Sequence, residues 1–96
     1  MFVVTLTYVQ PLEQVDAHLE AHRAFLAEHY ANGTFLVSGP QEPRTGGVIL
    51  AQAESFNALQ AVLAQDPFHV HGVAQYQVVQ FAARAAAPGL EQLVGA

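Results

Sequence analysis

The sequence contains no cysteine and no tryptophan, and only three of its 96 residues are lysine or arginine. Without cysteine, disulfides, thiolate metal ligands and a cysteine nucleophile are all excluded. Three basic residues are too few for the positive patch that binds nucleic acid or an anionic membrane surface. No apolar stretch approaches the roughly 20 residues of a membrane span, and no signal peptide is recognisable at the N-terminus. We therefore expect a cytoplasmic protein that binds neither nucleic acid nor membrane.

The residues that are present are mostly apolar. The hydrophobic fraction is 52%, the charged fraction is 11%, and the formal net charge is −5. A chain of this length forms one domain, and such a small domain has little interior. The excess of apolar side chains therefore predicts that the protein associates with itself.

Strand-like and helical patterns alternate along the chain. Strands are expected over residues 1–9, 35–38, 48–51 and 75–82, because these segments are rich in β-branched, aliphatic and aromatic side chains. One helix is expected over residues 11–32, and a second between the N-cap Ser55 and the Asp66-Pro67 break. Residues 40–47 have the composition of an exposed turn, and residues 68–72 are expected to be irregular. The domain is expected over residues 1–84, followed by a tail, residues 85–96, with a possible helical turn at 90–94.

This β-α-β-β-α-β order predicts an α+β protein of the ferredoxin-like type, with an antiparallel sheet and two helices on one face. Several strands, such as Val48-Ile49-Leu50, carry apolar side chains on both faces. Because two helices cover only one face, we expect a second copy to pack sheet to sheet, as a homodimer that forms an α+β barrel. The alternative is that the tail from residue 82 onward folds over the sheet of its own chain.

His22 lies in the middle of the apolar stripe of the first helix. The positions expected to point inward are Leu12, Val15, Leu19, His22, Leu26 and then His29 or Tyr30. An imidazole titrates closest to neutral pH, so His22 is a candidate general acid and base. The alternative is a core histidine whose ring nitrogens are satisfied by neighbouring groups.

Asp66 is the candidate partner of His22. Both helices lie on the same face of the predicted sheet, so the end of one can approach the side of the other. A carboxylate that accepts the ring N–H fixes the tautomer of a catalytic histidine. The alternative is that Asp66 only terminates its helix in an Asp-Pro turn.

Ser38 and Gly39 close the second strand, either as a simple turn or as the mouth of a ligand pocket. No Gly-x-Ser-x-Gly motif surrounds Ser38, so it is not read as a hydrolase nucleophile. Arg23 and Arg44 are expected in solvated surface positions, with neutralisation of an anionic ligand as the alternative.

The histidines also invite a metal interpretation. His18 and His22 are four residues apart, a spacing that can place two imidazoles on one metal. However, His18 lies beside the apolar stripe, and no glutamate follows it as in the zinc-protease motif. We therefore expect no metal and no cofactor, and expect His29, His69 and His71 at the surface or at the rim of a pocket.

An ordered set of short motifs resembles the YciI-like (YCII-related) family. The set comprises residues 21–26 (AHRAFL), Gly33, residues 36–40 with Ser-Gly-Pro, Gly46-Gly47, Asp66-Pro67-Phe68 and Gly72. The resemblance covers residues 1–82 and implies a ferredoxin-like fold, a dimeric α+β barrel and a His-Asp pair that maps onto His22 and Asp66, with Ser38 nearby. Many members have an arginine one turn before the histidine, where this chain has His18 and Leu19.

What is known of similar proteins implies a class of chemistry. A dehydrochlorinase of a chlorinated hydroxyquinol is similar to this family, and muconolactone isomerase shares the barrel architecture. The resemblance thus implies a cofactor-free lyase or isomerase that transfers protons on small oxygenated ring compounds, dehydrohalogenation included. His22 and Asp66 would be catalytic, and Ser38, Gly39 and Phe68 would bind substrate. The alternative is a non-catalytic small-molecule binder or an accessory dimerisation domain.

Overall fold

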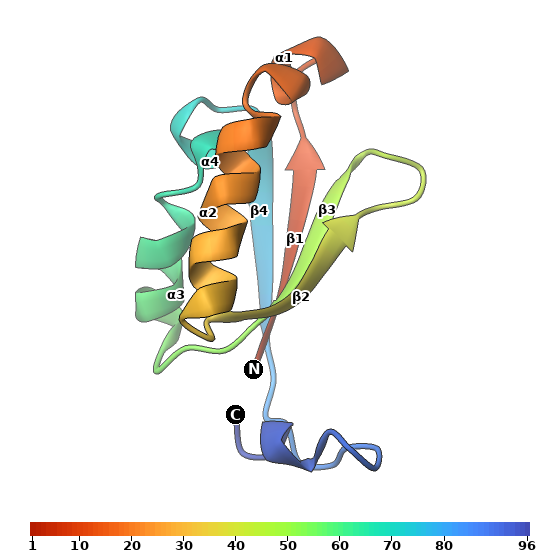
Figure 1. Cartoon of the computed structure of the whole chain (residues 1–96), viewed down its shortest axis with the longest axis vertical. Helices are drawn as coiled ribbons and strands as arrows, with labels where there is room; N and C mark the ends of the chain where they lie inside the picture. Colours follow the sequence, from red (N-terminus) through yellow and green to blue (C-terminus); the bar gives the residue numbers. More distant parts are fainter.

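The computed structural model describes residues 1–96 and contains one four-stranded antiparallel sheet. The strands follow the order β2-β3-β1-β4 across the sheet. Their bounds are β1 Phe2–Tyr8, β2 Phe35–Pro40, β3 Gly46–Ala51 and β4 Ala74–Gln80. The two central strands, β3 and β1, are therefore far apart in sequence, and a helical segment lies between them along the chain (Figure 1).

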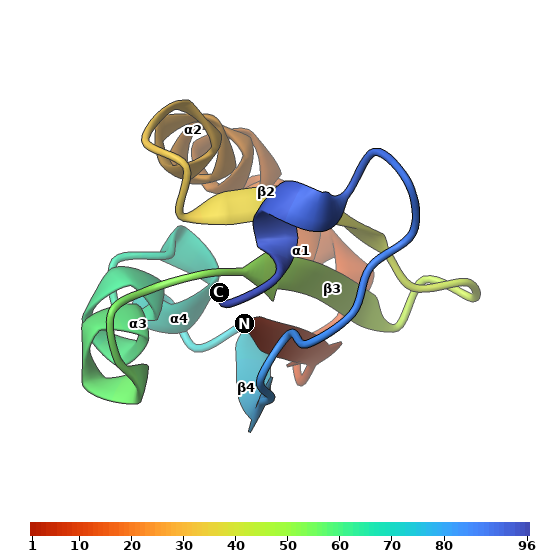
Figure 2. The same ribbon diagram turned by 90° about the horizontal axis from the view of Figure 1, so that it is seen from below.

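The helices cover one face of this sheet, as Figures 1 and 2 show from two directions. They are α1 Leu12–Ala17, α2 Leu19–Ala31, α3 Phe56–Leu63 and α4 Pro67–Val70, and a short 3-10 turn, η1, spans Glu91–Leu93. The first predicted helical segment is thus divided in two, and α4 is a helix beyond the predicted end of the second segment, but the β-α-β-β-α-β order is unchanged. The predicted ferredoxin-like α+β fold is confirmed. None of the helices is long and apolar enough to cross a membrane.

The prediction of a single helix over residues 11–32 is wrong, because the helix is interrupted at His18. His18 has φ −112° and ψ 6°, and its N–H bonds back to Val15 and Asp16 to close α1. The predicted inward stripe holds from Val15 to His29, with Leu19 and Leu26 packed against the core, but not at Leu12 or Tyr30. Leu12 is 45% exposed and Tyr30 is also exposed, whereas Val15 and Phe25 are buried.

Residues 68–72 were expected to be irregular, and this expectation is also wrong for the first three of them. Asp66 is the N-cap of α4, where its side chain accepts the N–H of Phe68, and Pro67 occupies the first helical position. Both are standard features of a helix start. The predicted N-cap Ser55 is confirmed, since its side chain accepts the N–H of Ala58 at 3.0 Å.

The core lies between the sheet and the helices. Alternate residues of β1 point into it, and the buried set includes Phe2, Val4 and Leu6 of β1 with Leu59 and Leu63 of α3. Phe56 is 42% exposed, because it occupies the first position of α3 beside the N-cap. This helix layer determines where the ends of α2 and α4 meet.

The other face of the sheet carries an apolar row with no helix above it. The pairing register places one apolar residue of each strand in line across the sheet: Val37, Leu50, Val3 and Val79. At the ends of this row, Val37 is 59% exposed and Val79 is 61% exposed. The tail does not cover them, because residues 82–96 run beyond the end of the sheet at which β1 begins (Figure 1). The predicted alternative, a tail folded over its own sheet, is therefore wrong.

Candidate active site

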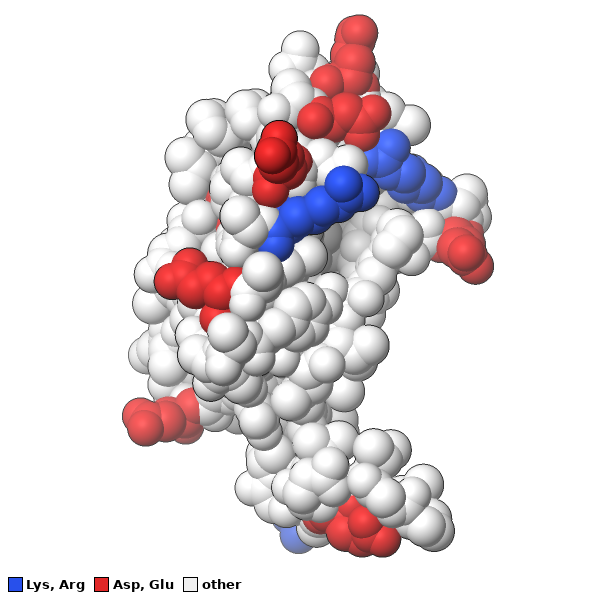
Figure 3. Space-filling model, viewed as in Figure 1, with Lys and Arg blue, Asp and Glu red and all other residues white.

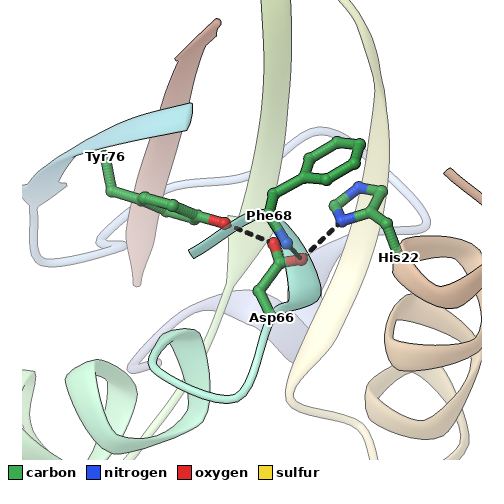
Figure 4. A network of polar contacts seen from close by, with 4 residues as sticks. All are labelled: His22, Asp66, Phe68 and Tyr76. Carbon is green, nitrogen blue, oxygen red and sulfur yellow. Dashed lines mark hydrogen bonds and ion pairs between the residues drawn. The ribbon is translucent and has the colours of Figure 1, made fainter. Parts of the chain in front are cut away.

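Helices α2 and α4 bring His22 and Asp66 together across 44 residues of sequence. His22 Nδ1 lies 2.7 Å from Asp66 Oδ1 (Figure 4). The Asp66 side chain is fully buried, and that of His22 is 11% exposed. The imidazole is thus held at the edge of the core, and the carboxylate lies behind it in the interior.

Three donors satisfy the buried carboxylate of Asp66. Oδ1 accepts from His22 Nδ1 and from the backbone N–H of Phe68 at 3.0 Å. Oδ2 accepts from the Tyr76 hydroxyl at 2.5 Å. A buried carboxylate without such partners would be strongly destabilising. The Asp-Pro turn and the pairing with His22, posed as alternatives by the sequence, are therefore combined in one side chain.

Tyr76 is the functional residue that the sequence analysis missed. It lies on β4, on the helix-facing side of the strand, and its hydroxyl points at Asp66 (Figure 4). Burial, together with the hydrogen bond to Asp66 and its negative charge, raises the pKa of Tyr76 far above its ordinary value. Tyr76 therefore stays protonated and acts as a permanent donor to the carboxylate. Alternation along β4 predicts its inward direction, but no local signal identifies its partner.

The contacts of His22 define its tautomer. Because an ionised carboxylate only accepts hydrogen bonds, the proton of the neutral ring lies on Nδ1, and Nε2 keeps its lone pair. The ring of Phe68 stacks on the imidazole, with centroids 3.9 Å apart and an interplanar angle of 4°. This arrangement leaves Nε2 as the ring nitrogen that can accept or deliver a proton.

A cavity of about 320 Å³ opens in front of His22, between α2 and the β2–β3 hairpin. The predicted binding residues Ser38, Gly39 and Phe68 all line it, and the Ser38 hydroxyl is also hydrogen-bonded to Tyr30. The volume falls at the lower end of the range typical of small-molecule sites. The cavity can therefore hold one small ring beside the imidazole.

Gly46 forms part of the cavity wall where β3 passes close to β1. A Cβ atom at this position would lie 1.7 Å from the carbonyl oxygen of Leu6. Only glycine fits such an approach. The Gly46-Gly47 pair is thus explained by strand packing beside the site.

The remaining histidines do not form a metal centre. No group of three or more His, Asp or Glu side chains is placed to hold a metal ion. His18 instead stacks on His71, with centroids 3.9 Å apart. His29 is 5% exposed and packs on Phe25 and Phe35, so its place in the predicted inward stripe is correct and the expectation that it lies at the surface or at a pocket rim is wrong.

Comparison with known proteins identifies a family and a solved structure of similar fold. Residues 1–82 match the YCII-related domain. The fold is similar to that of 5-chloro-2-hydroxyhydroquinone dehydrochlorinase from Burkholderia phenoliruptrix, solved in complex with 2,5-dihydroxybenzoquinone. The TM-score is 0.71 at 22% identity, over 84% of this chain and 93% of that one. No protein with a curated description matches the sequence. Since the match covers nearly the whole domain, this chain belongs to the YCII-related family.

Proposed function

We propose that this protein is a cofactor-free enzyme of the lyase or isomerase type, which moves a proton on a small oxygenated ring compound. The observation that carries the proposal is the 2.7 Å contact between His22 and the buried Asp66, made at the wall of a cavity. The dehydrochlorinase with a similar fold was solved with a quinone bound, which supports an oxygenated ring as the substrate class.

In the proposed mechanism, His22 Nε2 takes a proton from a ring carbon next to an oxygenated carbon. The imidazolium that forms is stabilised by Asp66, which retains its own negative charge. In a dehydrochlorination, the ring reacts as its diketo tautomer, in which the chlorinated carbon and the neighbouring carbon are both sp3. The electron pair of the broken C–H bond then forms a C=C bond, and chloride leaves with its bonding electrons. His22 then releases the proton to water, so the net product is the unsaturated ring with HCl. In an isomerisation, the same proton returns to a different atom of the ring.

The binding residues have separate roles in this proposal. Phe68 is 1% exposed and stacks face to face on the imidazole, so it holds the plane of the His22 ring and adds apolar surface to the cavity lining. Ser38 offers its hydroxyl, and Gly39, which has no side chain, allows the ring to approach the backbone of β2. The ring therefore sits between α2 and the hairpin with one edge at Nε2.

We further propose that two copies pack through the open face of the sheet. The row from Val37 to Val79 crosses all four strands and is too apolar to remain in water without a partner. The variant Val79→Glu should be monomeric by analytical ultracentrifugation. Val70→Glu is the matched control, because Val70 is 64% exposed but lies on α4, in the helix layer. A dimer that survives Val79→Glu as well as it survives Val70→Glu would contradict this arrangement.

The activity can be tested with the substrate named for the similar dehydrochlorinase. Wild type should release chloride from 5-chloro-2-hydroxyhydroquinone, and His22→Gln should reduce the rate by about 100-fold or more, the usual contribution of a general base. His71→Gln is the control, since His71 is exposed and does not line the cavity. Equal turnover in a folded His22→Gln variant would refute the proposed role.

A further inference from the structure

The basic side chains of this acidic protein are concentrated at one place. Only three residues are lysine or arginine, and two of them, Arg23 and Arg44, line the cavity in front of His22. The third, Arg84, is exposed in the C-terminal tail. Figure 3 shows the basic side chains of the domain gathered over the hollow beside α2, with acidic side chains spread around them. The net charge of −5 makes the protein as a whole repel anions, whereas the mouth of the cavity carries two positive charges.

The two arginines come from opposite walls of the cavity. Arg23 follows His22 directly on α2, whereas Arg44 belongs to the connection between β2 and β3. Both belong to the cavity lining together with Ser38 and Gly39. A ligand that enters between α2 and the hairpin therefore passes between two guanidinium groups.

Arg44 is held in place and still has free donors. Its Nη2 donates to Asp16 Oδ1 at 2.6 Å, and its guanidinium carbon lies 5.9 Å from the centre of the Tyr8 ring. The hydrogen bond to Asp16 raises the pKa of Arg44 above its ordinary value, so the group is fully charged. Because a guanidinium has five N–H donors, this one contact leaves several for a ligand.

Arg23 has no partner of its own. It forms no ion pair and no side-chain hydrogen bond in the structure, although its side chain reaches the cavity. A guanidinium offers a planar fork of N–H groups that matches a carboxylate in two parallel hydrogen bonds. An unpaired arginine beside a cavity in an acidic protein is thus free to bind an anionic group.

We infer that the natural substrate is a ring compound bearing a carboxylate, which Arg23 and Arg44 bind at the mouth of the cavity. The inference rests on the proposed function only in placing the substrate in front of His22. The ring lies in the cavity beside the imidazole, with its reacting carbon at His22 Nε2 and its carboxylate toward solvent. The cavity, about 320 Å³, has room for one ring with a short substituent.

The test is direct binding of a carboxylate probe and of its neutral ester. The probes are 2,5-dihydroxybenzoate and its neutral methyl ester, and their affinities are measured by isothermal titration calorimetry at low and high salt. The wild-type protein should bind the acid about tenfold more tightly than the ester, as expected for charge-assisted hydrogen bonds. The advantage of the acid should shrink with salt, because the arginines are exposed.

Three variants test which arginines cause the preference for the acid over the ester. Arg23→Gln and Arg44→Gln should each remove most of the preference for the acid and leave the affinity for the ester unchanged. Arg84→Gln is the matched control, because it removes the same charge from the tail and should change neither affinity. Equal binding of acid and ester by the wild type, no saturable binding of the acid at millimolar concentration, or equal losses in Arg23→Gln and Arg84→Gln would overturn the inference.

Turnover by wild type and by His22→Gln, measured beside binding, separates this inference from the proposed reaction. If acid binding keeps its dependence on the arginines but no carboxylated ring is turned over, the proposed function fails and the anion site stands. If His22-dependent turnover is found and neutral rings react as well as carboxylated ones, the anion site fails and the proposed function stands.

Discussion

Replacement of Tyr76 by phenylalanine tests whether the buried carboxylate organises the site. The hydroxyl of Tyr76 donates to Asp66 Oδ2 at 2.5 Å, and Asp66 is fully buried. The substitution removes this donor without changing the shape of the ring, and Oδ2 then has no other protein partner. A hydrogen bond to a charged group contributes about 1.5–3 kcal/mol, so we expect a loss of about 2 kcal/mol in the free energy of unfolding.

The assay is thermal or urea unfolding at a fixed protein concentration, because self-association also affects apparent stability. For a domain of this size, a loss of 2 kcal/mol corresponds to a fall in Tm of about 8–16 °C. Tyr30→Phe is the control, since it removes a hydroxyl from an exposed hydrogen bond with Ser38 and should cost less than about 1 kcal/mol. Equal effects of the two substitutions would refute the reasoning about the buried carboxylate.

The dependence on pH gives an independent check with a defined sign. Because the native state raises the pKa of Tyr76, the unfolded chain loses this proton near pH 10, whereas the folded protein keeps it. The folded state then binds more protons than the unfolded state, and stability falls as pH rises above that value. This one group contributes a slope of up to about 1.4 kcal/mol per pH unit. Tyr76→Phe lacks that contribution, so its stability should approach that of wild type between pH 10 and 11, and a constant difference would contradict the assignment.

Three further substitutions have definite expected results. Asp66→Asn should lower turnover by about 10²–10⁴-fold, because an amide that donates to His22 Nδ1 leaves the proton on Nε2, and steady-state kinetics would detect it. Gly46→Ala should prevent stable folding, since its Cβ would lie 1.7 Å from the Leu6 carbonyl oxygen between β1 and β3, and circular dichroism would report it. Ser55→Ala should cost about 1 kcal/mol in urea unfolding through loss of the α3 N-cap, with activity unchanged. Native-like melting of Gly46→Ala, or wild-type turnover of Asp66→Asn, would count against the structure of the site.

Much of the fold could be predicted from local patterns. Alternation of side chains along residues 2–8 and 74–80 determines which residues face the helices, because the period of a strand is two. The N-cap Ser55 acts within three residues of itself, so its position at a helix start was visible in the sequence, whereas Asp66-Pro67 was expected to end a helix and instead begins α4. The break at His18 was not visible, since neither glycine nor proline marks it.

The site was likewise predicted only in part. The sequence by itself identified His22 and Asp66 as an unusual histidine and a helix-ending aspartate, and the resemblance to a family linked them. Only the tertiary structure decided that Asp66 also bonds Tyr76 and that Arg23 and Arg44 face one cavity. The physical reason is that caps, turns and strand alternation depend on neighbours in the chain. A buried carboxylate and a cavity mouth instead depend on side chains from separate elements, which only the packing of α2, α4 and the hairpin brings together.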